Sequence, residues 1–179
     1  MKTLLTEDQL REGIRRLADE IQKHYQGKPL TIVGVLIGSV VLLADLIRLL
    51  DLPLCVEMVQ ARSYRGNSTK PGPLAVNLEL LSTGIQSRNV LLVDDIFDTG
   101  HTLWELIPQI DELGPSSVRS AVLLQKEGRC EVPMKPDFVA FKIPNEFVVG
   151  YGLDYNDHYR NLPYLAVLEP NEIADQQGQ

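Results

Sequence analysis

Three carboxylates and a Thr-Gly-x-Thr turn follow one another directly after a short apolar segment. The segment Val90-Leu91-Leu92-Val93 leads into Asp94 and Asp95, and Asp98-Thr99-Gly100-His101-Thr102 comes next. Carboxylates can hold sugar hydroxyls and a metal ion, and the amides of a turn that opens a helix bind anions. The two threonines add hydroxyl donors. The pattern therefore predicts a sugar-phosphate site, with the sugar and metal on the acids and the phosphate in the turn.

A strand and a helix must position these groups. Residues 90–93 are typical of a fully buried strand, and residues 101–113 of a helix. Ligands of open α/β sheets bind at the carboxyl ends of strands, and adjacent side chains of a strand point in opposite directions. One acid can therefore face a ribose diol while the other orients loop amides or metal-bound water. The alternative is a plain buried strand with an acidic N-capping turn, in which Asp98 or Thr99 is the N-cap.

The remaining periodicity predicts an α/β fold. A capping box, Thr6-x-x-Gln9, opens a helix that should end near Gly27-Lys28-Pro29. Further strands are expected at 30–36, 54–61, 74–80, 118–124, 137–141, 147–149 and 164–167, and a further helix at 40–50. Strands that alternate with helices indicate one domain over residues 1–179, with a mostly parallel sheet flanked by helices.

The composition excludes several partners. The net charge of −7 and the isoelectric point near 4.9 argue against a nucleic-acid or anionic-membrane surface. No apolar run approaches the roughly 20 residues of a membrane span. Cys55 and Cys130, the two cysteines, make no disulfide framework, so we expect small buried hydrophobic side chains in a cytoplasmic protein.

The stretch from Asn89 to Leu103 resembles the phosphoribosyl-diphosphate (PRPP) signature of the type I phosphoribosyltransferases, and the similarity runs from about Thr31 to Leu168. Asp98 is similar to the aspartate of the branch that acts on 6-oxopurines. The resemblance implies a core at about 28–125 and a purine-binding hood at about 126–168, while the polar composition of residues 171–179 predicts a frayed tail. It also implies purine salvage by a dimer or tetramer. Ribose-5-phosphate would pass from PRPP to N9 of hypoxanthine or guanine, giving IMP or GMP and pyrophosphate.

The resemblance also implies roles for the signature residues. Asp98 would be the general base at purine N7. Asp94 and Asp95 would hold the ribose and contribute to a Mg²⁺ site. The 5′-phosphate would lie in the turn formed by Asp98, Thr99, Gly100, His101 and Thr102.

A second strand–turn–helix unit contains Leu36, Ile37 and Gly38. On its own it is a weak signal, and a plain turn explains it. The resemblance makes it the pyrophosphate loop, with a cis peptide bond between Leu36 and Ile37. Family members often have Lys or Asn in place of Ile37, so only a backbone contact remains here.

The polar segment 62–77 is long for a connection, which is typical of a lid. Its Ser63 and Tyr64 match the dipeptide of the family's flexible loop, which closes over PRPP.

The purine site is implied by the C-terminal part of the similarity. Lys126 ends a predicted strand and would face the purine O6, although a strand-end lysine is usually a solvated charge. Four further roles belong to the segment 147–160. Phe147 would stack on the base, Val148 and Asp154 would read its edge through the backbone, the Asp154 carboxylate would hold Mg²⁺, and Arg160 would reach pyrophosphate. Glu146 departs from relatives that have Lys there.

Two other functions stay open at this point. One is a non-catalytic regulatory protein on the same fold that binds PRPP or a nucleotide together with RNA, and the acidic charge argues against it. The other is a transferase that prefers xanthine.

Overall fold

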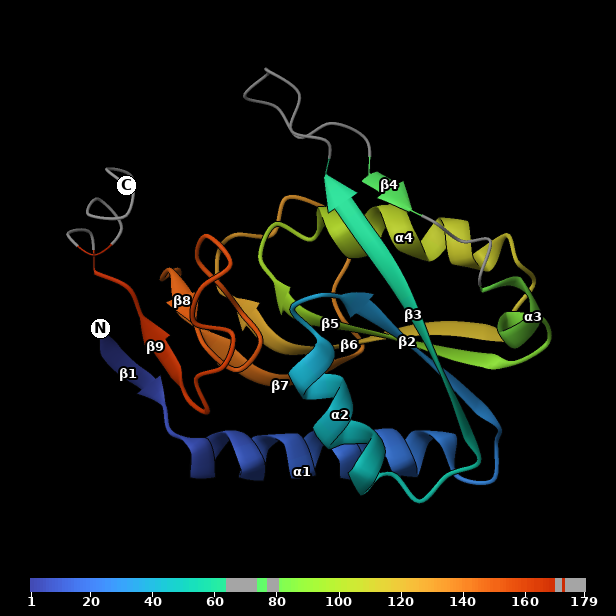
Figure 1. Ribbon diagram of the computed structural model, residues 1–179. Helices are drawn as coiled ribbons and strands as arrows, with labels where there is room; N and C mark the ends of the chain where they lie inside the picture. Colours follow the sequence, from blue (N-terminus) through green and yellow to red (C-terminus); the bar gives the residue numbers. More distant parts are fainter. Residues whose placement is uncertain (64–73, 77–80, 170–171, 173–179) are drawn as a thin grey trace.

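Five parallel strands form the centre of the molecule (Figure 1). The structure is a computed structural model that describes residues 1–63, 74–76, 81–169 and 172. The strand order is β3-β2-β5-β6-β7, and β4 continues the sheet antiparallel to β3. The predicted parallel α/β fold is confirmed. The strands are β2 (Leu30–Leu36), β3 (Leu54–Ser63), β4 (Leu74–Val76), β5 (Asn89–Phe97), β6 (Ser117–Lys126) and β7 (Phe138–Ile143).

Helices cover both faces of this sheet. In Figure 1, α1 (Glu7–Tyr25) and α2 (Val40–Leu49) lie below it, and α4 (His101–Asp111) lies above it, with the short α3 (Ser82–Ile85) at one end. Leu91 and Val93 of β5 belong to the core cluster of α1 and α2. Val90 and Leu92 belong to the core cluster of α4. Burial on both faces is why β5 begins as a continuous apolar run.

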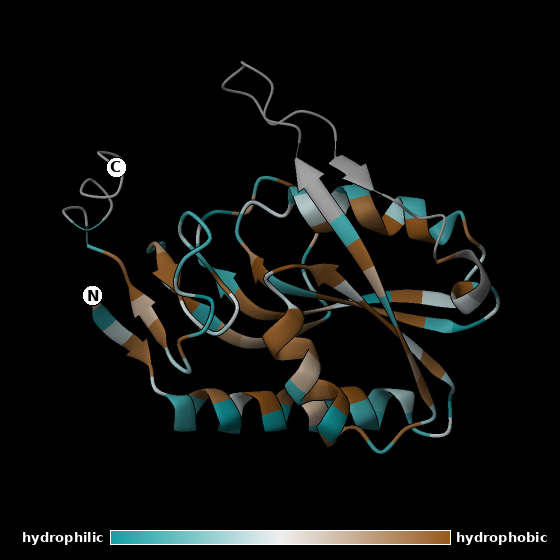
Figure 2. Cartoon of the chain, viewed as in Figure 1, coloured by the Kyte–Doolittle hydropathy of each residue, from teal (hydrophilic) through white to brown (hydrophobic). Residues whose placement is uncertain are grey.

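Helix α1 begins and packs as its sequence predicts. Thr6 and Gln9 form the expected capping box. Hydrophilic and hydrophobic residues alternate along the helix (Figure 2), and the apolar ones are buried against the sheet. At Gly13 the helix approaches β7 so closely that a Cβ atom would lie 2.0 Å from the ring of Phe141.

A second, antiparallel sheet joins the two ends of the chain. Its order is β1-β9-β8, with β1 at Lys2–Leu5, β8 at Val148–Val149 and β9 at Leu165–Val167. The sequence predicted the last two strands but not β1. This strand is short and partly exposed, and its partner comes from the far end of the chain, so local periodicity carries little signal for it.

Two expectations need correction, and one detail of the alternative interpretation is contradicted. Strand β5 does not end at Val93 but continues through both acids to Phe97, because its ladder with β6 continues. Cys55 and Cys130 are exposed rather than buried. Cys55 lies near the start of β3, and Cys130 lies in the loop after β6. The N-cap of α4 is Gly100, not Asp98 or Thr99.

Some expectations fall outside the described residues. These are Tyr64 of the proposed lid, the part of the predicted strand beyond Val76, and the tail except for Glu172. Within the described part of the chain, no helix is long and apolar enough to span a membrane.

Candidate active site

The acid pair of β5 lies at the edge of a cavity. Asp94 is 6% exposed, and one of its oxygens, Oδ1, accepts a hydrogen bond from the amide of Asp95 at 3.0 Å. The carboxylate of Asp95 lies against Gly38, where a Cβ atom would be 1.6 Å from Oδ2 of Asp95. A glycine is therefore required at position 38 by this contact.

Burial dominates the electrostatics of the two acids. Loss of solvation raises the pKa of Asp94 well above its usual value, and the charge of Asp95 raises it further. Burial also raises the pKa of Asp95, opposed by hydrogen bonds and by the charge of Arg160. Two poorly solvated carboxyls side by side are stabilised by hydroxyl donors or by a cation. The pair is thus suited to sugar hydroxyls and to a metal ion.

The turn after β5 opens directly into α4. Gly100 has φ of +91°, and its carbonyl accepts the amide of Trp104 at 3.0 Å. The turn therefore places the amides of residues 99–102 at the N-terminus of a helix, where anions bind. The ring of His101 lies outside this turn, with Nε2 at 3.2 Å from Oε2 of Glu131.

Asp98 lies between two cations. Its Oδ2 is 3.0 Å from Nζ of Lys126, and its Oδ1 is 2.9 Å from Nε of Arg129. Partial burial alone would raise the pKa of Asp98, but the hydrogen bonds from Arg129 and Lys126 outweigh it and lower that pKa. Arg129 was not predicted as a site residue, because a basic residue in the loop after a strand carries no recognisable spacing.

The loop between β2 and α2 has the backbone that the resemblance implies. The Leu36–Ile37 peptide bond is cis. The side chain of Ile37 is 53% exposed, so it leaves the loop's backbone open. Gly152 approaches this loop so closely that a Cβ atom would lie 2.2 Å from the carbonyl oxygen of Gly38.

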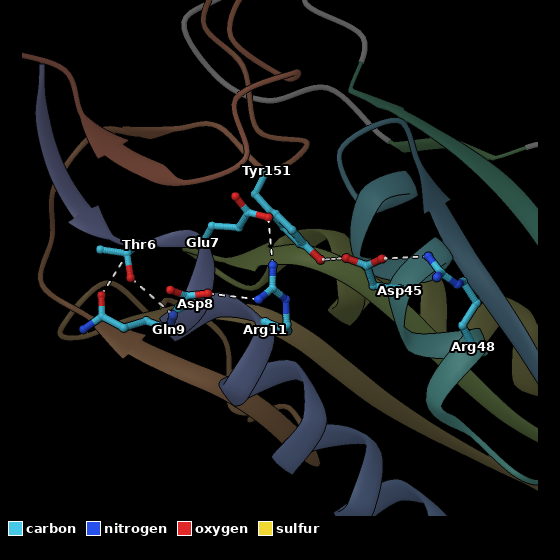
Figure 3. A network of polar contacts seen from close by, with 8 residues as sticks. All are labelled: Thr6, Glu7, Asp8, Gln9, Arg11, Asp45, Arg48 and Tyr151. Atoms are coloured by element: carbon cyan, nitrogen blue, oxygen red, sulfur yellow. Dashed lines mark hydrogen bonds and ion pairs between the residues drawn. The ribbon is translucent and has the colours of Figure 1, made fainter.

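Arg160 and Asp154 come from the segment after β8. Nη2 of Arg160 lies 2.8 Å from Oδ1 of Asp154, while Nη1 donates to the carbonyl of Gly152 at 2.8 Å. Tyr151 of the same segment donates its hydroxyl to Asp45 of α2, which also pairs with Arg48 (Figure 3). The first two contacts brace the segment 150–160 internally, and the contact of Tyr151 with Asp45 joins it to α2.

One cavity of about 340 Å³ brings most of the predicted residues together. Its lining combines the acids of β5, the turn, the loop before α2 and two side chains of the later segment: Val35, Leu36, Ile37, Gly38, Asp94, Asp95, Ile96, Phe97, Asp98, Thr99, Gly100, Thr102, Leu103, Asp154 and Arg160. A larger hollow of about 580 Å³ lies between α1, α2 and residues 151–163 and shares Arg160, but it contains neither the acid pair nor the turn. We therefore place the chemistry in the smaller cavity.

Five predicted residues that the structure describes are not part of that lining. Lys126 is connected to it through Asp98. Phe147 is exposed and lies edge-to-face with Tyr155, their ring centroids 5.4 Å apart. Val148 is buried in β8, and the ring of His101 points to Glu131. Ser63 is the last residue of β3.

No group of three or more His, Cys, Asp or Glu side chains that could hold a metal occurs among the residues described. The carboxylates that line the cavity are Asp94, Asp95, Asp98 and Asp154, and Asp98 is already paired with Lys126 and Arg129. Mg²⁺ is often held by one or two carboxylates together with substrate phosphates. The donors therefore fit a metal that arrives with a phosphorylated substrate.

Comparison with known proteins identifies the family. Residues 2–156 match the phosphoribosyl transferase domain. A hypoxanthine-guanine phosphoribosyltransferase of Lactococcus lactis is 42% identical, over 94% of this chain and 91% of its own length. The bifunctional protein TilS/HprT of Listeria innocua is 38% identical over 97% of this chain, which spans only 27% of that relative. A solved hypoxanthine phosphoribosyltransferase from Staphylococcus aureus superposes with a TM-score of 0.89 at 37% identity, covering 96% of this chain and 92% of that one. With the site geometry above, these similarities show that the chain belongs to the phosphoribosyl transferase family.

Proposed function

We propose that this protein is a purine salvage enzyme that moves ribose-5-phosphate from PRPP to N9 of hypoxanthine or guanine, giving IMP or GMP and pyrophosphate. The observation that carries the proposal is the single cavity that combines an acid pair, a helix-opening turn and Asp98. The names of the similar proteins support the same reaction.

PRPP would occupy this cavity along its length. The amides and hydroxyls of residues 99–102, including the backbone amide of His101, would hold the 5′-phosphate. Asp94 and Asp95 would accept hydrogen bonds from the ribose hydroxyls. The backbone of residues 36–38 and the guanidinium of Arg160 would hold the pyrophosphate.

The donor set also fits Mg²⁺, with Asp154, Asp94 and Asp95 as its protein contacts. When bound, the ion would neutralise the charge that develops on the pyrophosphate leaving group.

The base would lie between the turn and the second sheet. Lys126 would donate to O6, which rejects adenine because the 6-amino group of adenine is also a donor. As N9 forms its bond to C1′ of the ribose, the bond from C1′ to the pyrophosphate oxygen breaks and its electrons leave with pyrophosphate. Asp98 would accept the proton from N7. Phe147 would stack on the ring, and the backbone of Val148 and Asp154 would read its edge.

The remaining expectations complete this proposal. Residues 1–179 would form one domain, in which a hood at about 126–168 covers the purine above a core at about 28–125. Ser63 and Tyr64 would belong to the loop that closes over PRPP. The exposed thiols of Cys55 and Cys130 suit a reducing cytoplasm.

A homo-oligomer, a dimer or tetramer, also forms part of the proposal. Its support is the family resemblance, together with individual exposed apolar side chains on α2, on the loop before it and on β3. These side chains are Ile37, Val40, Leu49, Val56 and Met58. Where such side chains form one contiguous surface, they mark a site of protein association.

An ultraviolet absorbance assay with PRPP and Mg²⁺ tests the reaction. Hypoxanthine, guanine, xanthine and adenine are supplied separately. We expect turnover of hypoxanthine or guanine and none of adenine. Turnover of xanthine above both would indicate the xanthine-preferring alternative. Tight PRPP binding without turnover of any base would indicate the regulatory alternative.

A further inference from the structure

Both carboxylate oxygens of Asp98 are bound by cations in this structure. Nζ of Lys126 is 3.0 Å from Oδ2, and Nε of Arg129 is 2.9 Å from Oδ1. The two cations differ in their surroundings, because the side chain of Lys126 is 10% exposed and that of Arg129 is 41% exposed. Each oxygen of this carboxylate therefore already accepts one charge-assisted hydrogen bond, which makes it a weaker acceptor for a proton from a purine.

The loop after β6 holds Arg129 over the turn. The amide of Glu131 donates to the carbonyl of Thr99 at 2.9 Å. Val132 packs on Gly100, where a Cβ atom would lie 2.5 Å from its Cγ2. The carboxylate of Glu131 contacts His101 and raises the pKa of Arg129, after the larger effect of Asp98 itself. The loop thus ties the position of Arg129 to the turn that carries Asp98.

Lys126 and Arg129 have different binding partners during the proposed reaction. The proposed function, on which this inference rests, needs Lys126 at the purine O6. Moving there releases Oδ2 of Asp98. Nothing in the proposed reaction draws Arg129 away, so Oδ1 stays bound and the carboxylate keeps its orientation. A base held by a second group that orients it is a recurrent arrangement in proton-transfer sites.

We propose that Arg129 is a positioning residue that holds Oδ1 of Asp98, so that Oδ2 faces purine N7 once Lys126 has moved to O6. The exchange of Lys126 links recognition of the base to proton transfer. A base without an acceptor at position 6 leaves Lys126 paired with Oδ2 of Asp98, so that this oxygen is not released to face N7. Two effects therefore disfavour adenine. The Lys126 ammonium and the 6-amino group are both donors, and Oδ2 of Asp98 stays paired with Lys126.

The charges that face Asp98 set the expected pH dependence. Among the described residues these are Lys126 at the end of β6 and Arg129 in the following loop, and the charge of Glu131 acts on Arg129. Removing Arg129 removes one of two cations that favour the ionised carboxylate. We therefore expect Asp98 to be protonated at higher pH in such a variant.

The test is Arg129→Gln, with Arg119→Gln as a matched control. Arg119 is 42% exposed and also pairs with an aspartate, Asp137, but it lies near the opposite end of β6. In Arg129→Gln we expect kcat to fall about tenfold through lost orientation. The acid limb of kcat/KM should move about one unit to higher pH. The KM for PRPP should stay unchanged, and the control should match wild type in all three quantities.

Arg129→Lys provides the second variant. It retains the charge, so we expect the wild-type acid limb to return and kcat to recover most of the loss. Wild-type kcat and an unmoved acid limb in Arg129→Gln would overturn the inference, as would a Lys variant as slow as the Gln variant. If Arg129→Gln does not fold, as judged by its thermal midpoint, the Lys variant decides alone. Absence of turnover in the wild type would instead refute the proposed function.

Discussion

At the scale of single residues, the site combines carboxylates in opposite electrostatic states. Asp98 is held ionised by two cations, while burial raises the pKa of Asp94 and of Asp95. Carboxyls whose surroundings shift their pKa values in opposite directions serve different roles in one site. Here the low-pKa carboxyl faces the proposed purine, and the buried pair faces the proposed sugar.

Asp98→Asn tests the proton acceptor. The amide is nearly isosteric but cannot accept the N7 proton, so we expect kcat to fall about 10²–10⁴-fold. PRPP affinity should survive. The single tryptophan, Trp104, lies in the first turn of α4, beside the turn that we propose binds the 5′-phosphate, and its fluorescence can report PRPP binding. Asp111→Asn, at the other end of α4, is the control. Wild-type turnover in Asp98→Asn would refute the assignment.

Asp94→Asn should stabilise the fold while weakening PRPP binding. A folded-state pKa above the unfolded value means that the carboxyl contributes stability below its unfolded pKa, and that this contribution is lost as pH rises through the folded pKa. At pH 7 the buried charge therefore costs stability. We therefore expect the free energy of unfolding to rise at pH 7, with a gain that shrinks toward pH 4.

Urea denaturation in the presence of a chelator measures this gain, with Asp19→Asn on the exposed face of α1 as control. The control should change stability by no more than about 0.5 kcal/mol. A variant that is less stable than wild type at pH 7 would contradict the electrostatic interpretation of the acid pair.

At the scale of elements, the cavity depends on a direct backbone contact between the loop before α2 and the segment after β8. Gly152 has φ of +98°, and its Cα faces the carbonyl of Gly38. The segment after β8 therefore supports the loop before α2, and the side chains of Asp154 and Arg160 are carried by the same segment. Contacts of this kind position the backbone groups that we propose bind pyrophosphate.

Gly152→Ala should disrupt this contact. Left-handed strain costs about 1 kcal/mol, and the clash with Gly38 adds to it, so we expect a loss of about 2 kcal/mol or more. PRPP affinity should fall at least about tenfold, because the pyrophosphate loop must move. Gly27→Ala is the control, since Gly27 has φ of +73° with open space around it. Equal effects of the two substitutions would show that the loop contact contributes nothing.

At the scale of the whole molecule, α1 closes one face of the sheet and its neighbour β1 joins the second sheet. Among the described glycines at which a helix meets a strand, Gly13 of α1 leaves the least room for a Cβ atom, because the ring of Phe141 of β7 lies against it. The packing of these elements thereby connects the parallel core with the antiparallel sheet beside the proposed purine site.

Gly13→Ala tests this packing. Helix propensity alone would favour alanine by about 1 kcal/mol, but a methyl group would collide with the ring of Phe141. We expect a net loss of about 1–3 kcal/mol by urea denaturation. In a Phe141→Leu background the same substitution should be neutral or stabilising. A loss of the same size in both backgrounds would rule out the clash as its cause.

The sequence by itself determined the parallel core and the positions of the chemical groups along it. The apolar run before Asp94, the glycine of the turn and the capping box of α1 are local signals, and each was found where the pattern predicted it. Resemblance added the cis bond after Leu36, which the structure confirms.

The tertiary structure decided the contacts between segments distant in the chain. It paired β1 with β9, exposed both cysteines, and placed Arg129 on Asp98. None of these follows from periodicity, because each depends on which segments meet after folding and not on the spacing within one segment. A loop arginine has the same local sequence whether it faces solvent or a carboxylate, and only the packing of that loop on the turn distinguishes the two.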